Sequence, residues 1–151
     1  MKPGDPAPDF ELPDETGTTR SLKELLSSGP VVLFFYPAAM TPGCTAESCH
    51  FRDLAKEFAE VGASRVGISP DAVAKQHEFS TKHSFDFPLL SDADGTVSRQ
   101  FGVRRSFGPL LTKRQTFIID TDGKILEVIK SELRMSVHAD KALEVLRSRK
   151  S

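Results

Sequence analysis

The strongest constraint on the fold is a continuous apolar run at residues 31–36, VVLFFY, which is bounded by Pro30 and Pro37. The run is rich in β-branched and aromatic residues and does not alternate with polar ones. A strand of this kind is buried on both faces, as in a sheet covered by helices on each side. It is also far too short to cross a bilayer, which takes about 20 residues. We therefore expect a central strand at residues 31–36 in an α/β protein.

Hydrophobic periodicity and turn signals place the other elements around this strand. Further extended segments are expected at residues 64–68, 87–90, 115–120 and 124–130, and helices at residues 22–26, from residue 42 to near 62, from about 70 to 82, at 97–101 and around 139–146. The first half requires right-handed parallel crossovers, and the turn at residues 121–123 closes an antiparallel hairpin. The prediction is an α/β fold with a central mixed β-sheet and helices on both faces. Because 151 residues suit one domain, we expect a single domain over residues 1–151.

Composition excludes several classes of function. Lys plus Arg number 20 and Asp plus Glu number 21, so the net charge of −1 provides no field that would recruit nucleic acid or a membrane surface. Residues 1–15 lack an apolar core of signal-peptide length. The two cysteines are too few for a disulfide framework. We therefore expect a cytoplasmic protein that binds neither nucleic acid nor membrane.

Cys44 is expected in the first turn of the helix that follows the central strand. Thr41 suits the N-cap position and Pro42 the first helical position. Functional sites collect at the carboxyl ends of strands in open α/β sheets, and the free N–H groups of a helix N-terminus stabilise a thiolate there. A purely structural role remains equally open on position alone, because free cysteine is often a small buried apolar residue.

Cys49 lies five residues after Cys44 on the same predicted helix. That spacing gives a net rotation of about 140° and a rise of roughly 7.5 Å, which separates the Cα atoms by roughly 8–9 Å. A disulfide requires about 4.4–6.8 Å. The two cysteines can therefore bond only if the first turns of the helix unwind.

Zinc is a competing use of the cysteines, since Cys44 and Cys49 are followed directly by His50. The two sulfur atoms diverge on one helix, however, so we expect no metal site. The four histidines, His50, His77, His83 and His138, are predicted to be surface residues. On the helix near residues 70–82, Gln76 is predicted to face outward with Lys75, Glu78 and Lys82.

Three segments, in order along the chain, resemble the peroxiredoxin family. YPAAMTPGCTAESCHFRD at residues 36–53 resembles the family's active-site signature, above all that of the bacterioferritin-comigratory-protein or peroxiredoxin Q branch, whose resolving cysteine follows the peroxidatic one by five residues. GDPAPDFELPDETG at residues 4–17 resembles the N-terminal signature. RQTFIIDTDGKI at residues 114–125 resembles the strand and hairpin that carry the second active-site arginine or its equivalent. The resemblance implies a thioredoxin-like fold.

The resemblance also implies a role for each matching residue. Cys44 would be the peroxidatic nucleophile and Cys49 the resolving thiol. Thr41 would hydrogen-bond the peroxide, and Pro37 would shield the site from water. Arg114 would hold the thiolate and the developing negative charge, as helix N–H groups would also do.

Neighbouring positions complete the implied site. Glu47 matches an acidic position of the branch that orients an arginine, and Gly43 is a supporting residue. Arg104 and Arg105 are possible substitutes for Arg114. The branch's lysine or aspartate after Pro37 is replaced by AAM at residues 38–40, which alters the rim of the pocket more than the chemistry.

The implied function is a thioredoxin-dependent, atypical two-cysteine peroxidase in antioxidant defence, acting as a monomer without metal or other cofactor. Hydrogen peroxide or an organic hydroperoxide would convert Cys44 to a sulfenic acid, and Cys49 would condense with it after local unwinding. Thioredoxin or a related dithiol would then reduce the disulfide. Two rival functions remain: a thiol–disulfide oxidoreductase, which usually needs a C-x-x-C spacing, and a redox sensor that turns over poorly.

Overall fold

The computed structural model describes residues 1–105 and 111–149. Its strands are β1 (Glu11–Pro13), β2 (Thr19–Ser21), β3 (Val31–Phe35), β4 (Ser64–Ser69), β5 (Leu89–Ser91), β6 (Gln115–Ile119) and β7 (Ile125–Lys130). Its helices are α1 (Leu22–Leu26), α2 (Pro42–Asp53), α3 (Ala55–Glu60), α4 (Val73–His83), α5 (Thr96–Gln100) and α6 (Ser136–Ser148). Within these described residues, no helix combines the length and the apolar character needed to span a membrane.

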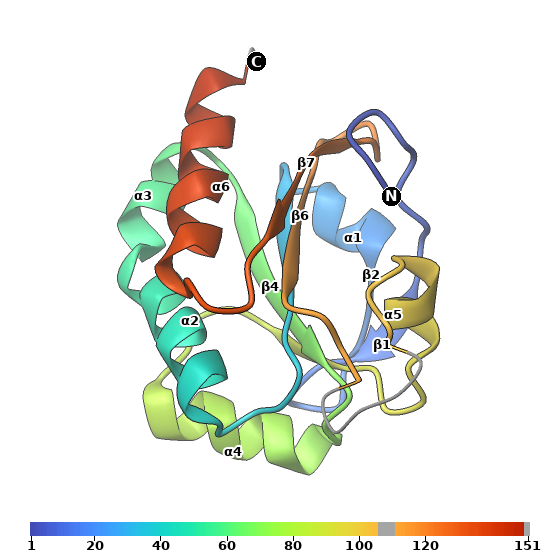
Figure 1. Ribbon diagram of the computed structural model, residues 1–151, viewed down its shortest axis with the longest axis vertical. Helices are drawn as coiled ribbons and strands as arrows, with labels where there is room; N and C mark the ends of the chain where they lie inside the picture. Colours follow the sequence, from blue (N-terminus) through green and yellow to red (C-terminus); the bar gives the residue numbers. More distant parts are fainter. Residues whose placement is uncertain (106–110, 150–151) are drawn as a thin grey trace.

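The central sheet is mixed, and the apolar run supplies its middle strand. Five strands lie in the order β5-β4-β3-β6-β7 (Figure 1). β3 is parallel to β4 and antiparallel to β6, so that Leu33 lies opposite Val66 on one side and Phe117 on the other. Every residue of β3 is buried. The predicted mixed sheet with a buried central strand is confirmed.

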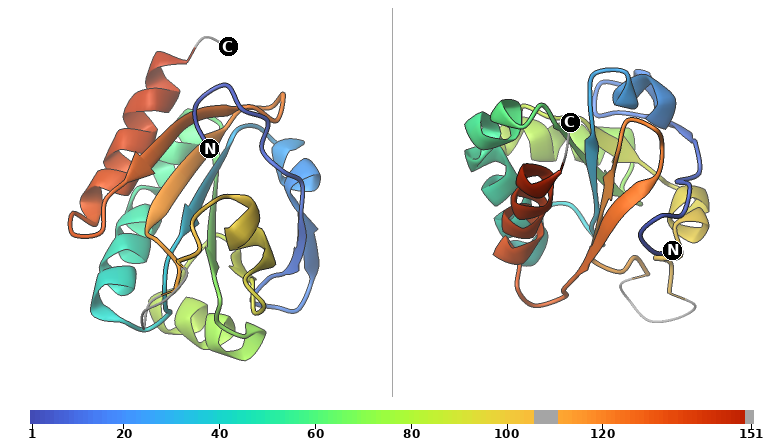
Figure 2. Two further views of the ribbon diagram at one scale, coloured as in Figure 1. Left: turned by 45° about the vertical axis from the view of Figure 1, so that its right-hand side comes forward. Right: turned by 90° about the horizontal axis from the view of Figure 1, so that it is seen from above.

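Helices cover both faces of this sheet, as predicted. α2, α3, α4 and α6 lie on one face, whereas α1, α5 and the β1–β2 ribbon lie on the other (Figures 1 and 2). Buried apolar side chains form one cluster on each face of the sheet, and successive side chains of β3 alternate between the two. Phe34 packs in the cluster on the face of α2, α3, α4 and α6, whereas Leu33 and Phe35 pack in the cluster on the other face. This alternation follows from the period of two in a strand.

The helix predicted from residue 42 to near 62 is wrong in one respect, because it breaks at Leu54 into α2 and α3. The Phe51 carbonyl, which would accept the Ala55 N–H in a continuous helix, instead accepts a 2.8 Å hydrogen bond from Arg65 Nη1 and a 3.3 Å hydrogen bond from the Leu54 N–H. A guanidinium from β4 thus competes for a helix carbonyl, and the chain turns there.

The prediction that Gln76 faces outward is also wrong. The Gln76 side chain is fully buried. Its amide nitrogen donates to Ser69 Oγ at 2.9 Å and to the Leu90 carbonyl at 2.8 Å, and its oxygen accepts a 2.6 Å hydrogen bond from the Tyr36 hydroxyl. These partners replace the hydrogen bonds to water that the amide loses on burial.

Candidate active site

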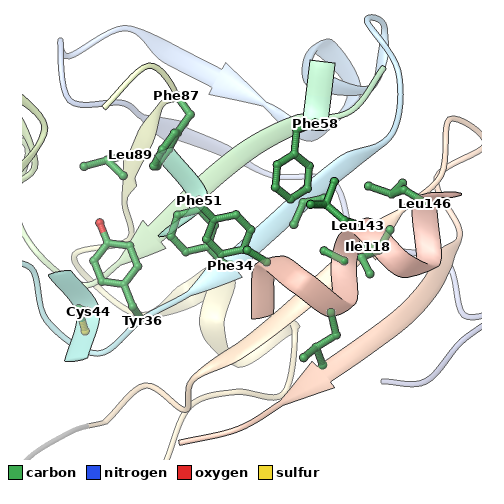
Figure 3. Close-up of a cluster of buried hydrophobic side chains, with 14 of the residues drawn as sticks. Phe34, Tyr36, Cys44, Phe51, Phe58, Phe87, Leu89, Ile118, Leu143 and Leu146 are labelled. Atoms are coloured by element: carbon green, nitrogen blue, oxygen red, sulfur yellow. The ribbon is translucent and has the colours of Figure 1, made fainter. Parts of the chain in front are cut away.

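The site forms where β3 ends and α2 begins. Tyr36 directly follows β3, and Cys44 lies in the first turn of α2, as predicted. Cys44 is fully buried, and it lies beside Tyr36 at one end of the apolar cluster formed by the stacked Phe34 and Phe51 (Figure 3). A sulfur atom at this place is shielded from bulk water and sits at the positive end of a helix.

Arg114 joins Cys44 to Glu47. Its Nη2 lies 3.1 Å from Cys44 Sγ, and its Nη1 donates a 2.7 Å hydrogen bond to Glu47 Oε1. The Arg114 side chain is 6% exposed and that of Glu47 is fully buried, so solvent screens neither contact. The Arg114 N–H donates a 2.9 Å hydrogen bond to Glu132 Oε2, which ties the residue before β6 to the segment between β7 and α6. Cys44, Glu47 and Arg114, three of the residues that the sequence nominated, therefore meet in one cluster.

Gly43 makes room for this guanidinium. A Cβ atom at Gly43 would lie 3.3 Å from Arg114 Nη2 and 3.4 Å from Met135 Cε. The separation from Arg114 Nη2 is tighter than ordinary van der Waals contact, and the separation from Met135 Cε is at its lower limit. The absence of a side chain at residue 43 therefore lets Arg114 reach the sulfur atom.

Burial also perturbs the acid of the cluster. It raises the pKa of the Glu47 carboxyl group from 4.5 to about 8, and the Arg114 guanidinium opposes this rise only in part. Arginine keeps its charge at any physiological pH. The site therefore combines a fixed positive charge with a carboxyl group that retains a proton near neutrality.

Thr41 occupies the N-cap position of α2 with an extended backbone, as predicted, but its hydroxyl does not cap the helix. The hydroxyl instead donates a 2.7 Å hydrogen bond to the Ala38 carbonyl. The N–H groups of Gly43 and Cys44 lie within the first helical turn and have no partner within the helix. They remain available to an oxyanion or peroxide oxygen.

The segment between β3 and α2 is held in place by burial and by a hydrogen bond to Asp71. Pro37 and Ala39 are buried, and the Ala39 N–H donates a 2.6 Å hydrogen bond to Asp71 Oδ2. Met40 has a φ of 70°, which is an unusual conformation for a residue with a side chain. Such backbone strain persists where surrounding contacts over-determine the conformation, as they often do at functional sites.

Cys49 lies further along the same unbroken helix, and both cysteines are free thiols. It is half-buried, and burial raises the pKa of its thiol, an effect that Arg52 partly offsets. Of the two substitutes considered for Arg114, Arg105 forms a 3.2 Å ion pair with Glu132, and Arg104 packs against Gly95. Neither makes a hydrogen bond or ion pair with Cys44 among the described residues.

Comparison with known proteins decides the family. Residues 3–128 match the model of the AhpC/TSA family. The chain belongs to the peroxiredoxins of this family. It is 67% identical over 153 residues to a Mycobacterium tuberculosis protein named as a peroxiredoxin, covering 100% of this chain and 99% of the relative.

Solved structures agree with this assignment. The crystal structure of the peroxidoxin BcpB of Mycobacterium tuberculosis has a TM-score of 0.96 at 66% identity, covering 100% of this chain and 99% of that one. The bacterioferritin comigratory protein of Xanthomonas campestris has a TM-score of 0.83 at 33% identity, covering 92% and 90%. The fold is therefore thioredoxin-like, and the protein is a thiol peroxidase related to the peroxiredoxin Q branch with an antioxidant role.

One buried residue of this peroxiredoxin was missed by sequence reasoning. His138, predicted to be a surface residue, is fully buried on α6 beside Glu47. Its position one residue before Ala139, the first of the apolar residues that mark α6, was the available signal. His50, in contrast, is only partly buried and forms a 2.7 Å hydrogen bond with Asp140. Across the described residues, no group of three or more His, Cys, Asp or Glu side chains is placed to hold a metal ion.

In the irregular stretch at residues 102–114, the sequence offers Phe107, Leu110 and Leu111 either as an apolar wall of the peroxiredoxin pocket or as core residues. Phe107 and Leu110 lie outside the described residues. Leu111 instead lines a cleft of about 430 Å³ together with Arg99, Arg104 and Arg105. The described part of this stretch is thus basic.

Proposed function

We propose that Cys44 is the peroxidatic cysteine and that the geometry around it performs the first step of peroxide reduction. The Cys44 thiolate attacks one oxygen of the hydroperoxide and the O–O bond breaks, which gives the Cys44 sulfenic acid. The leaving oxygen takes up the proton that the thiol released and departs as water or an alcohol. The observation that carries this proposal is the 3.1 Å contact between Arg114 Nη2 and Cys44 Sγ. A buried guanidinium at this distance attracts the negative charge of the attacking sulfur atom.

Stabilisation of the transition state must supply most of the rate. An ordinary thiol is already about 3% ionised at pH 7, so that complete ionisation gains at most about 30-fold. In the transition state negative charge spreads over the sulfur and both peroxide oxygens. Arg114 and the N–H groups of Gly43 and Cys44 are donors directed at that region.

Thr41 and Pro37 are proposed to position the peroxide and to exclude water. The Thr41 hydroxyl hydrogen is already committed to the Ala38 carbonyl. Its oxygen lone pairs therefore remain to accept the O–H of a bound hydroperoxide. The buried Pro37 offers no N–H and shields the sulfur atom from solvent.

Cys49 is proposed as the resolving thiol. It attacks the Cys44 sulfenic acid, water leaves, and an intramolecular disulfide forms. The helical spacing requires the first turns of α2 to unwind for this step. Unwinding also exposes Cys49, which removes the burial that raises the pKa of its thiol. Two electrons from an external dithiol, thioredoxin or a similar protein, then restore both thiols.

The substrates proposed are hydrogen peroxide and organic hydroperoxides. Alkyl peroxide reduction is the activity named for the bacterioferritin comigratory protein of Xanthomonas campestris, which is 33% identical to this chain. The protein is proposed to act as a monomeric single domain spanning residues 1–151.

Intact-mass spectrometry of the reduced protein after one equivalent of hydrogen peroxide tests this cycle. We expect the loss of two hydrogens, mapped by digestion to a bond between Cys44 and Cys49. The matched variant Cys49→Ser should instead gain one oxygen at Cys44 and hold it. A persistent gain of one oxygen in the wild type would exclude Cys49 as the resolving thiol. No rapid change in either protein would exclude the peroxidatic role of Cys44.

A further inference from the structure

We propose that His138 is a positioning residue for the peroxidase reaction: it shares one proton with Glu47 and so keeps the Glu47 carboxyl group from drawing Arg114 away from Cys44. The inference rests on the proposed peroxidatic role of Cys44. It concerns a side chain on α6 that does not touch the sulfur atom and acts through two other residues.

The hydrogen bonds of His138 determine which ring nitrogen carries hydrogen. Nε2 lies 2.8 Å from the Ser131 carbonyl oxygen, and a carbonyl only accepts, so Nε2 is the protonated nitrogen. Nδ1 lies 2.7 Å from Thr116 Oγ1, whose hydroxyl donates to it. Burial lowers the pKa of His138, so the ring is neutral near pH 7. The single Nδ1 lone pair, which accepts from Thr116 in this state, is therefore the ring's only site for a further proton, and Glu47 Oε2 also lies near it.

Glu47 offers an unused oxygen to that nitrogen. Glu47 Oε1 accepts from Arg114, whereas the buried Oε2 has no hydrogen-bond partner among the described residues. Glu47 Oε2 lies 3.6 Å from His138 Nδ1. This separation exceeds a hydrogen bond by roughly half an ångström, a gap that a small rotation of either side chain closes. Nδ1 can take the Oε2 proton only if the Thr116 hydroxyl, which occupies its one lone pair, turns to accept a hydrogen bond instead of donating one.

The charge balance of the cluster favours one shared proton. A Cys44 thiolate and a Glu47 carboxylate would place two negative charges on the single Arg114 guanidinium in a buried site, which is unfavourable. One proton on the Glu47–His138 pair leaves a balanced thiolate–guanidinium pair. The other charged group facing the pair is Glu132, which follows β7 and raises the pKa of both Glu47 and His138. The pKa of Glu47, raised by burial to about 8, places the proton there at pH 7.

The pair therefore predicts a pH dependence. Below about pH 8 Glu47 is protonated, and Arg114 is directed to the thiolate. As the pH rises through that value Glu47 loses its proton, and its carboxylate competes for the guanidinium. The second-order rate constant for Cys44 oxidation should consequently fall on the alkaline side.

Two variants separate this role from simple packing. His138→Gln keeps a donor for the Ser131 carbonyl but leaves nothing at the Nδ1 position, and His138→Asn places an amide near Nδ1 that cannot take up a proton. His50→Gln is the matched control, because His50 pairs with the exposed Asp140 and, among the described residues, makes no hydrogen bond or ion pair with Glu47. In each protein the single-turnover rate constant of Cys44 with hydrogen peroxide is measured from pH 6 to pH 10, beside the melting temperature.

We expect both His138 variants to react about tenfold more slowly at pH 7, because the reaction rate falls steeply when the guanidinium is misplaced. The pH at which the rate constant falls on the alkaline side should also differ from that of the wild type. The His50→Gln profile should match the wild type. His138 variants with the wild-type rate constant and pH profile, whatever their melting temperature, would overturn the proposal. If these variants do not fold, Glu47→Gln decides: an alkaline fall that persists without the carboxyl group would overturn it equally. A wild-type Cys44 that does not react would refute the peroxidatic role instead.

Discussion

The two ends of α2 are held by different kinds of contact. Near its carboxyl end, Phe51 is fully buried and stacks on Phe34, with ring centroids 4.2 Å apart and planes inclined by 11°. Arg65 also binds the Phe51 carbonyl. The turn between the buried Cys44 and this end buries polar side chains instead, those of Glu47 and Ser48. One end is thus fixed by aromatic packing, whereas the other depends on polar contacts.

This difference indicates where α2 can open. Ser48 Oγ and Glu47 Oε2 are buried without a hydrogen-bond partner among the described residues, and both regain hydrogen bonds to water if their turns unwind. Phe51 would gain no such compensation. The segment that must unwind for a bond between Cys44 and Cys49 ends just before the aromatic anchor. Opening up to residue 49 therefore leaves the core largely intact.

The largest expected effect comes from removing the anchor. Phe51→Ala deletes a ring from the packed cluster, and we expect the free energy of unfolding to fall by about 3–5 kcal/mol. Urea denaturation measures this change. Phe51→Leu is the control, and it should lose less because it leaves a smaller cavity. A loss below about 1 kcal/mol for Phe51→Ala would show that α2 is not anchored at this end.

The next effect tests the polar end. Arg114→Gln removes the cation between Cys44 and Glu47, and we expect the rate constant of Cys44 oxidation to fall by about 10²–10³-fold at pH 7. Stopped-flow measurement with hydrogen peroxide provides the rate. Arg147→Gln, at an exposed position on α6, should react like the wild type. A loss of less than about fivefold would remove Arg114 from the reacting site.

The smallest expected effect concerns Ser48, which lies in the segment of α2 that unwinds. Ser48→Ala removes a buried hydroxyl without a partner and introduces a better helix former, so we expect α2 to gain about 1 kcal/mol. Disulfide formation should slow by about fivefold, since 1.4 kcal/mol corresponds to tenfold, while the first oxidation keeps its rate. Thr45→Ala, on the half-buried neighbouring position, controls for helix propensity alone. Equal slowing in both variants would contradict a special role for the buried hydroxyl.

Much of the fold follows from local patterns. The buried central strand, observed at Val31–Phe35, and the position of Cys44 in a first helical turn were predicted and are confirmed. The pattern of Ser21 followed by Glu24 is likewise a local capping signal, and Ser21 caps α1. The Ser21 hydroxyl oxygen accepts the Glu24 N–H at 3.1 Å. Periodicity and capping act within a few residues, so they can be read without knowledge of the tertiary structure.

The candidate site was predicted less completely. Cys44, Glu47 and Arg114 were named, and the structure brings them together, although the catalytic roles assigned to them remain proposals. Arg114 was nominated by resemblance rather than by pattern, because a basic residue before a strand carries no local signal of what it contacts. His138 was missed for a related reason: a histidine among apolar helix residues is buried only if distant partners satisfy both its nitrogens.

The sequence by itself determined the central strand, the helix that starts beside it and the five-residue spacing that keeps two thiols apart while that helix is intact. The tertiary structure alone decided which charge meets the sulfur atom, because Arg114 and Cys44 are 70 residues apart in the chain. It also decided the break at Leu54 and the burial of Gln76 and His138. In each case a polar group finds its partner across the fold, and polar burial is favourable only when that partner is present.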